Sequence, residues 1–205
     1  MSVTVTLGPL TPADVRPLAQ LHRAAFPGFF LSTLGEPFLV QFYLGFLADD
    51  SAVSIVARGA DGSVQGAVVG TIQPAGFFGR LVKNRWPGLI LASVRAVVSN
   101  PKAAPRLLRT VRYRGETRAG APGALLSSIC VDPSEQGAGV GRRLIDAWTR
   151  EVASRGVDTA FLTTDADNND AVNHFYQAQG WALSDSYATR EGRSMNCYTK
   201  RLDAF

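Results

Sequence analysis

The most informative stretch of this sequence runs from Ile129 to Leu144 and reads ICVDPSEQGAGVGRRL. It begins as an apolar strand, turns at an Asp-Pro pair, and passes through alternating glycines directly into an amphipathic helix. Glycine lets a backbone approach a ligand closely, and the first turn of a helix offers unpaired N–H groups with a partial positive charge. The stretch therefore predicts a phosphate-binding site, and Arg142 and Arg143 at the start of the helix strengthen the preference for an anion.

Two common phosphate motifs can be tested against this loop by their spacing, and both fail. A dinucleotide fingerprint needs a glycine three positions after Gly139, where the chain has Arg142. A nucleotide-triphosphate loop needs Gly-Lys-Ser/Thr, whereas Gly141 is followed by two arginines. The pattern that fits is Gln136-x-x-Gly139-x-Gly141, which resembles the pyrophosphate loop of the GNAT acetyltransferases.

A second stretch, residues 169–181, reads NDAVNHFYQAQGW. It resembles the Asn-x-x-Ala-x-x-x-Tyr-x-x-x-Gly-Phe segment of the same family, with Val172 and Trp181 in place of the commoner alanine and phenylalanine. The resemblance covers Leu125 to Lys200 well and the first 72 residues loosely, and it does not extend to the segment between Pro74 and Pro122.

The apolar periodicity along the chain predicts the order β-α-α-β-β-(insert)-β-α-β-α-β-β. This order indicates an α/β fold with a mixed central sheet flanked by helices. The resemblance implies that it is the GNAT acyl-CoA N-acyltransferase fold, with about seven strands. A helical insertion, about 74–122, separates the third and fourth strands within a single domain, 1–205. We expect one helix to begin near Ser32, and Trp86-Pro87 to open a helix that runs from Leu89 to Val98.

The resemblance implies that acetyl-CoA is the cosubstrate and assigns its contacts. Backbone groups of the strand Ile129-Cys130-Val131 would pair with the pantetheine arm as an added strand does, and Asn169 would approach the arm from the other side. Backbone N–H groups would hold the pyrophosphate, those of Gln136, Gly137, Ala138, Gly139, Val140, Gly141 and Arg142.

Acyl transfer to an amine needs a base for the attacking ammonium and an acid for the departing thiolate. By resemblance the acid is Tyr176, whose hydroxyl would lie beside the cofactor sulfur. Several members of the family use a glutamate on the fourth or fifth strand as the base, but this chain has only serines and threonines there. Asp165, just past the fifth strand, is the nearest carboxylate, and His22 is a weaker candidate. Cys130 lies inside an apolar strand, which argues against a nucleophilic role.

Composition narrows the class of protein. Apolar residues make up 46% of the 205 residues, without an apolar run long enough for a transmembrane helix. The two cysteines lie far apart, the two histidines are too few for most metal sites, and the N-terminus lacks the features of a signal peptide. We expect a cytoplasmic protein without a structural metal, and no motif that reads nucleic acid accompanies its basic residues.

The basic character of the chain is concentrated in the insertion. Between Gly76 and Gly120 there are ten basic residues and one acid, Glu116, whereas the net charge of the whole chain is only +4. A second insertion helix, capped by Asn100-Pro101, would place Arg106, Arg109 and Arg112 on one face. Three interpretations stay open: a solvated helix pair, peripheral contact with anionic lipid, or attraction of an anionic acceptor or partner. The sequence also leaves a homodimer open.

The leading functional interpretation is transfer of acetyl from acetyl-CoA to a primary amine of a small molecule, such as an amino sugar or another anionic metabolite. Protein or peptide N-acetylation is one alternative, and a non-catalytic acyl-CoA-binding regulatory module is another. The sequence does not identify the acceptor, and it does not say whether acyl groups other than acetyl are used.

Overall fold

A computed structural model describes residues 5–99, 122–189 and 192–202, apart from the side chains of Phe30 and of residues 97–99. Seven strands form one sheet in the order β1-β2-β3-β4-β5-β7-β6. The strands are β1 (Thr6–Pro9), β2 (Ala52–Arg58), β3 (Val64–Thr71), β4 (Ala124–Val131), β5 (Thr159–Asp165), β6 (Ala182–Ala188) and β7 (Ser194–Arg201). Neighbouring strands are antiparallel except for β4 and β5, which are parallel. The predicted mixed α/β architecture is confirmed.

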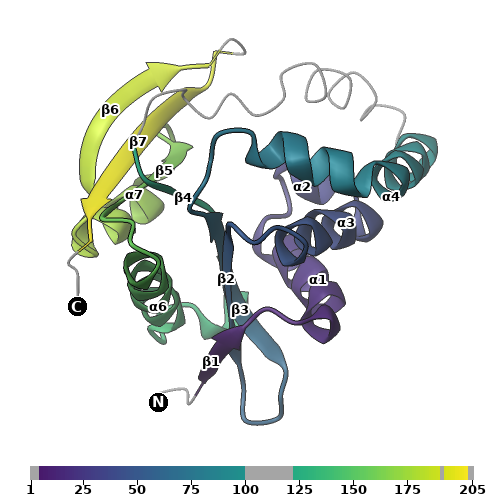
Figure 1. The fold of residues 1–205 in the computed structure, drawn as a ribbon, viewed down its shortest axis with the longest axis horizontal. Coiled ribbons are helices and arrows are strands. Elements are labelled where there is room, and N and C mark those ends of the chain that lie inside the picture. Colours follow the sequence, from purple (N-terminus) through teal and green to yellow (C-terminus); the bar gives the residue numbers. More distant parts are fainter. Residues whose placement is uncertain (1–4, 100–121, 190–191, 203–205) are drawn as a thin grey trace.

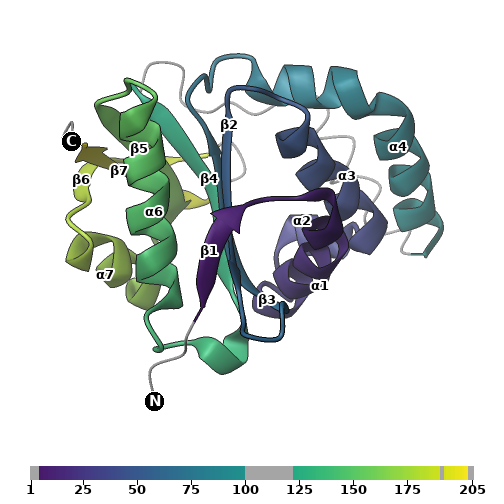
Figure 2. The same ribbon diagram turned by 60° about the horizontal axis from the view of Figure 1, so that its bottom comes forward.

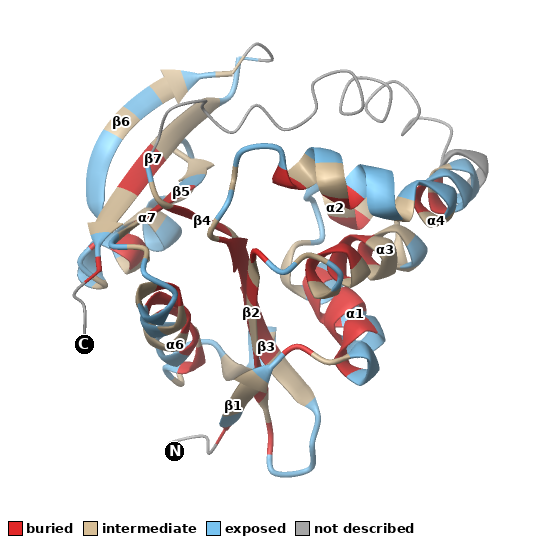
Figure 3. Cartoon of the chain, viewed as in Figure 1, coloured by how far each residue is buried: buried red, intermediate tan, exposed pale blue. Residues whose placement is uncertain are grey.

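Helices cover both faces of the sheet. One face carries α1 (Val15–Ala25), α2 (Phe30–Thr33), α3 (Glu36–Leu47) and α4 (Phe77–Ser99), and the other carries α6 (Val140–Ser154) and α7 (Asp170–Ala178) (Figures 1 and 2). Two apolar cores result, one on each face (Figure 3). The core under α6 is centred on the fully buried Trp148, and the core under α1 and α3 contains Leu18 and Leu39. The two helical layers therefore hold β4 between them.

The single helix predicted near Ser32 is two helices. The short helix α2 ends at Thr33, and α3 begins at Glu36. Between them Gly35 has φ +84°, in the left-handed region that favours glycine, and Pro37 occupies the first turn of α3. A periodicity that continues across Gly35 concealed this break.

The first helix of the insertion, α4, is confirmed between β3 and β4, but it begins at Phe77 and contains Pro87, so the predicted start after Trp86-Pro87 is wrong. Buried side chains occur on both sides of the proline at helical spacing, those of Phe77, Leu81, Leu89 and Ala92. Their common face packs on α3 and holds the helix together although Pro87 has no N–H to donate.

Glycines allow α3 and α4 to approach closely. A Cβ added to Gly45 would lie well inside van der Waals contact of the Leu81 side chain, and one added to Gly88 would collide with Gln41. A substitution at Gly45 would displace Leu81 from the contact, and one at Gly88 would displace the end of the Gln41 side chain. The inward face of α4 is therefore closely fitted to α3.

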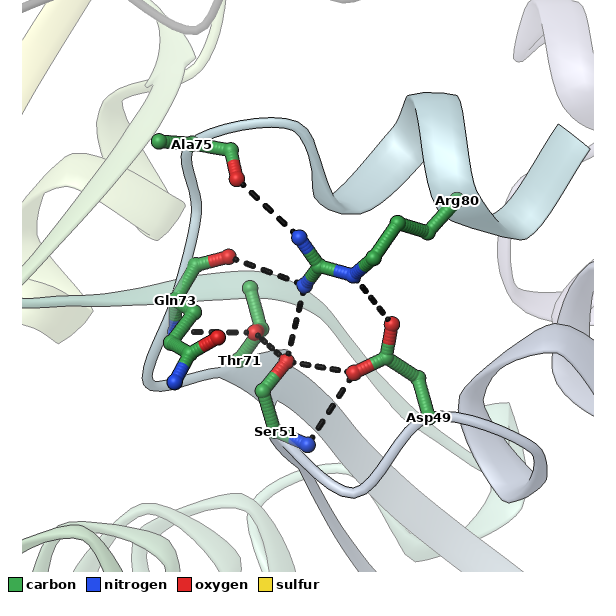
Figure 4. A network of polar contacts seen from close by, with 6 residues as sticks. All are labelled: Asp49, Ser51, Thr71, Gln73, Ala75 and Arg80. Atoms are coloured by element: carbon green, nitrogen blue, oxygen red, sulfur yellow. Dashed lines mark hydrogen bonds and ion pairs between the residues drawn. The ribbon is translucent and has the colours of Figure 1, made fainter. Parts of the chain in front are cut away.

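A polar network anchors the start of α4 to the sheet (Figure 4). The Nε of Arg80 donates to Oδ2 of Asp49 at 2.8 Å, and its Nη2 donates to Oγ of Ser51 at 3.1 Å. Ser51 in turn shares a hydrogen bond of 2.8 Å with Thr71 at the end of β3. Arg80 also donates to the carbonyl of Ala75 at 3.2 Å, so that its guanidinium joins three segments of chain.

The predicted second helix of the insertion, with Arg106, Arg109 and Arg112, lies outside the described residues. It stays a prediction.

Candidate active site

The loop between β4 and α6 has a defined conformation. Asp132 ends β4, and its Oδ1 accepts hydrogen bonds from the N–H and the hydroxyl of Ser134, at 2.9 Å and 2.6 Å. A single turn of 3-10 helix, Pro133–Glu135, follows. Gly137 and Gly139 then adopt φ values of +85° and +81°, and Gly139 is the N-cap of α6. These two glycines turn the chain into the first turn of the helix.

The same loop carries unpaired donors. In the described part of the chain, six of its N–H groups donate no hydrogen bond, those of Gln136, Gly137, Gly139, Val140, Gly141 and Arg142. The N–H of Ala138 donates to Glu135 at 3.2 Å, and the helical ladder begins only with Arg143 to Gly139 at 3.1 Å. Unpaired donors at the positive end of a helix dipole form an anion site. The structure therefore supplies the donors that the predicted phosphate loop requires.

The side chains of the two arginines at the start of α6 make different contacts. The Arg142 side chain is 71% exposed, and its nearest carboxylate is that of Asp146, at 3.9 Å. Arg143 donates to the carbonyl of Val5 at 2.8 Å and so ties the helix to the N-terminal segment. Arg142 is thus the less engaged of the two, and the contribution of both arginines to anion binding stays a prediction.

The strands β4 and β5 separate beside this loop. They pair only at their first residues, Ala124 with Ala160 and Leu125 with Phe161. A bulge interrupts the pairing of β4 with β3 between Ser128 and Leu126. Beyond it, one edge of β4 pairs with β3, while the other edge has no strand partner among the described residues.

This open edge belongs to Ile129, Cys130 and Val131, which were predicted to pair with the pantetheine arm. An unpaired strand edge can accept an extended ligand as an additional strand. It lies directly before the loop of unpaired N–H groups. An extended ligand with a phosphate end therefore finds both features in continuous order along the chain.

Tyr176 lies on α7 and packs against aromatic neighbours. Its ring is 6.1 Å from the rings of Trp181 and Tyr198, and the residue is 6% exposed. Its hydroxyl forms no hydrogen bond within the described residues, and it is not among the fully buried polar atoms. Burial raises the pKa of Tyr176 above the usual value for tyrosine. The hydroxyl is therefore protonated at neutral pH and free to donate.

Asp165 lies at the end of β5, but its carboxylate already has a partner. The Nη2 of Arg193 donates to Oδ1 and Oδ2 of Asp165 at 2.7 Å and 2.9 Å. The guanidinium also lies over the ring of Phe29, 5.9 Å from the ring centroid, and thereby connects the start of β7 with the start of α2. Both oxygens of the carboxylate are therefore engaged by the guanidinium.

Asn169 is used to hold the end of β5. Its Nδ2 donates to Oγ1 of Thr164 at 2.9 Å and to the carbonyl of Asp165 at 3.0 Å. Asn173 donates to the same carbonyl at 3.0 Å and accepts from the hydroxyl of Tyr198 at 2.9 Å. The predicted contact of Asn169 with the pantetheine arm stays a prediction. In the structure its amide holds the end of β5.

The two remaining candidates, His22 and Cys130, are buried in the layer under α1 and α3. Burial lowers the pKa of His22 to about 4, and its Nδ1 lies 2.7 Å from the hydroxyl of Tyr43. Burial raises the pKa of the Cys130 thiol to about 12, so that it is not a nucleophile at neutral pH. An imidazole that is enclosed and has so low a pKa is a weak and inaccessible base.

Sequence analysis missed Arg193. It lies in no recognised motif, and only the pairing of β5 with β7, in which Asp165 faces Met195, brings Arg193 next to the predicted base. Among the described residues no group of histidine, cysteine, aspartate and glutamate side chains is arranged to hold a metal ion.

Comparison with known families gives a direct match. The profile of the Acetyltransferase (GNAT) family matches residues 16–181 of this chain. This range includes the loop before α6, the open edge of β4 and Tyr176 on α7. No curated protein matches the sequence.

Solved structures share the fold at low sequence identity. The ribosomal-protein-S18-alanine N-acetyltransferase from Escherichia coli aligns at a TM-score of 0.59 and 15% identity, over 98% of this chain and 95% of that one. A GNAT family member from Desulfovibrio desulfuricans aligns at 0.64 and 15%, over 98% and 100%. An aminoglycoside 6'-N-acetyltransferase complexed with coenzyme A aligns at 0.61 and 14%, over 97% of each chain.

The names of these enzymes give different acceptors. The similarity therefore supports the fold of this chain and leaves its acceptor open. The family match over residues 16–181 is the stronger finding, because it covers most of the chain and both sequence motifs. This chain belongs to the GNAT family of acetyltransferases, enzymes that use acetyl-CoA as the acetyl donor.

Proposed function

We propose that this enzyme transfers an acetyl group from acetyl-CoA to a primary amine of a small molecule, within a single domain. The observation that carries the proposal is the set of unpaired N–H groups between Gln136 and Arg142, all except that of Ala138, beside the open edge of β4. The pyrophosphate of acetyl-CoA would accept from these N–H groups, with Arg142 beside it. The pantetheine arm would extend along Ile129 to Val131, so that the thioester lies in the gap between β4 and β5.

Tyr176 is the proposed general acid. In the reaction the amine nitrogen attacks the thioester carbonyl carbon, and the C–S bond of the resulting tetrahedral intermediate then breaks. The departing thiolate takes a proton from the hydroxyl of Tyr176. Because burial raises the pKa of Tyr176, its hydroxyl carries the proton at neutral pH, as the donor form of an acid must.

Asp165 is the proposed acceptor of the proton that the ammonium loses, acting through water. Both oxygens of this carboxylate are bonded to Arg193, and movement of the guanidinium away from one of them would open that oxygen to the water. An anionic group on the acceptor would attract Arg193 and free Asp165 at the same time. Acceptor binding would thereby prepare the base.

The proposed acceptor carries a negative charge as well as an amine, as a phosphorylated or nucleotide-linked amino sugar does. Arg193, 52% exposed at the start of β7, and the exposed ring of Phe29 lie on the side of β5 where the acceptor would enter. The basic residues of the insertion would raise the local concentration of such an anion. Protein or peptide acetylation remains the alternative, because the fold also occurs in an enzyme named for a ribosomal protein.

The experiment is release of coenzyme A thiol from acetyl-CoA in the presence of a panel of amines. The panel contains neutral amino sugars, their phosphorylated and nucleotide-linked forms, polyamines, and peptides with free N-termini. We expect the highest kcat/KM with the anionic amino sugars. Turnover with peptides alone would replace the proposal by protein acetylation, and acetyl-CoA binding without turnover on any amine would indicate a regulatory module.

Replacement of Tyr176 by phenylalanine tests the acid. Tyr176→Phe removes the hydroxyl and keeps the ring that packs on Trp181, so we expect kcat to fall by about 100-fold, the usual scale of general acid catalysis. Acetyl-CoA affinity, measured in parallel by calorimetry, should stay within about twofold, since the lost hydroxyl serves the transition state rather than binding. A variant that keeps wild-type turnover would return Tyr176 to a packing role.

A further inference from the structure

The outward face of α4 is apolar, which its inward packing does not require. Eight large apolar side chains are exposed in the described part of the chain, and five of them lie on α4: Val82, Trp86, Ile90, Leu91 and Val94. Trp86, Ile90 and Leu91 are 58%, 54% and 60% exposed. Four of the five are spaced by four residues and so form one stripe along the helix. A stripe of this size on a surface indicates an interaction site.

The charges on the same helix are of one sign. Residues 77–99 contain four basic side chains and no acid. Two of the four, Lys83 and Arg95, are exposed beside the apolar stripe, whereas Arg80 and Arg85 are held by Asp49 and by the carbonyl of Leu44. The remainder of the insertion, up to Gly120, adds six basic residues and one acid. An apolar stripe with a basic rim complements an apolar surface that carries negative charge.

We propose that α4 lies on an anionic lipid bilayer, with Trp86, Ile90, Leu91 and Val94 among the lipid headgroups and upper acyl chains. Lys83 and Arg95 would pair with lipid phosphate or carboxylate, and tryptophan favours this interfacial depth. No helix in the described chain is long and apolar enough to cross a bilayer, so the contact is peripheral. This proposal concerns where the enzyme works and does not depend on the identity of its acceptor.

A second copy of the chain is a less suitable partner for the same face. Dimerisation through α4 would bring two acid-free helices together and set Lys83 and Arg95 against the same residues of the other copy. An acidic protein surface would match the charges, but interfaces of that kind also offer hydrogen-bond partners. The exposed part of α4 between Trp86 and Val94 is instead wholly aliphatic or aromatic, apart from Ser93.

The chain provides its own probe for the test. It contains three tryptophans, of which Trp148 and Trp181 are 0% and 2% exposed, so that a change in tryptophan emission on binding reports Trp86. The full-length protein is titrated with vesicles of phosphatidylcholine containing phosphatidylserine, and with vesicles of phosphatidylcholine alone. We expect a blue shift of emission and co-sedimentation with the anionic vesicles only, both weakened by salt.

Two variants and a control assign the contact to α4. Trp86→Ser/Ile90→Ser removes the apolar contact, and Lys83→Glu/Arg95→Glu reverses the charge, and each should weaken vesicle binding by at least tenfold, since each basic residue near an anionic surface contributes about fivefold. Leu183→Ser, at an equally exposed apolar position on β6, should bind as the wild type does. Thiol release in the absence of vesicles should be unchanged in all variants, which shows that they are folded.

The outcomes are decisive in both directions. Absence of binding to anionic vesicles at low salt would overturn the proposal, and so would binding that the α4 variants do not weaken. Light scattering measures the oligomeric state and tests the alternative partner. A wild-type dimer that Trp86→Ser/Ile90→Ser converts to a monomer would overturn the proposal and assign this face to a second copy of the chain.

Discussion

The starts of α4 and α6 both follow a strand after a short loop. The polar groups at the start of α4 are paired with one another, whereas those at the start of α6 are not. At the start of α4, Arg80, Asp49 and Ser51 satisfy one another and the neighbouring carbonyls (Figure 4). At the start of α6, six backbone donors have no partner in the described chain. The first arrangement fastens a helix to the sheet. The second leaves to a ligand the N–H groups that a helix start leaves unpaired, together with those of the glycine loop before it.

The bodies of the two helices differ as well. The apolar residues of α6, among them Leu144, Ile145 and Trp148, are buried in the core, and its outward face is polar. In α4, Phe77 and Leu81 are buried while Trp86 and Ile90 face outward. The apolar side chains of α6 therefore stabilise the fold, whereas the exposed ones of α4 are those proposed to contact a lipid bilayer.

The largest expected effect is a difference in the free energy of unfolding between variants of the buried Trp148 and of the exposed Trp86. Trp148→Ala should lower the free energy of unfolding by about 3–5 kcal/mol, because it empties a fully buried site and removes the hydrogen bond of the indole to Val53. Trp86→Ala should change it by less than about 0.5 kcal/mol, as exposed substitutions do. Urea denaturation of both variants checks the pair. Similar losses would mean that the outward face of α4 is packed in solution.

A smaller effect is expected at the joint before α4. Asp49→Asn should cost about 1–3 kcal/mol at neutral pH, because it removes the charge from buried hydrogen bonds with Arg80 and Ser51. Acetyl-CoA affinity should not change, since the joint is not part of the proposed cofactor site.

The pH dependence of that effect has a definite sign. Burial alone would raise the pKa of Asp49, but the hydrogen bonds from Arg80 and Ser51 outweigh it and lower the pKa below the usual value. The stabilisation is therefore fully present above the usual pKa of a carboxyl group and is lost as the pH falls through the lowered one. Wild type and Asp49→Asn should converge in stability once the pH has fallen below the lowered pKa of Asp49. A stability difference between the two proteins that persists at that low pH would show that the ion pair is not its cause.

Sequence alone predicted the α/β fold, the order of its strands and helices, and the loop before α6. These depend on local periodicity and on glycines next to a helix start, which leave a direct trace in the residues. The extent of α4 was mistaken, because Pro87 is a helix breaker locally and only packing against Gly45 and Gln41 of α3 overrides it.

The surroundings of the predicted base were not foreseen for a similar reason. Arg193 reaches Asp165 through the pairing of β5 with β7, which lie 28 residues apart at this contact. The open edge of β4 likewise follows from a bulge and from the early separation of β4 from β5, neither of which has a sequence signature here. Residues that act through non-local contacts need the structure to be recognised.

The central claim is that the start of α6 binds the pyrophosphate of acetyl-CoA, and the two ends of α6 offer a matched test. Gly139 at its start and Gly156 just after its end have φ values of +81° and +80°, and a Cβ at either meets nothing within 4 Å. Valine at either site imposes the same backbone strain, but only at Gly139 does it disturb the unpaired N–H groups.

The measurement is calorimetric titration of acetyl-CoA into the wild type, Gly139→Val and Gly156→Val, with their unfolding free energies measured alongside. We expect both variants to lose similar stability, and only Gly139→Val to bind acetyl-CoA at least tenfold more weakly, about 1.4 kcal/mol. Equal affinity in all three proteins would contradict the proposed phosphate site and, with it, the assignment of acetyl-CoA to this end of the molecule.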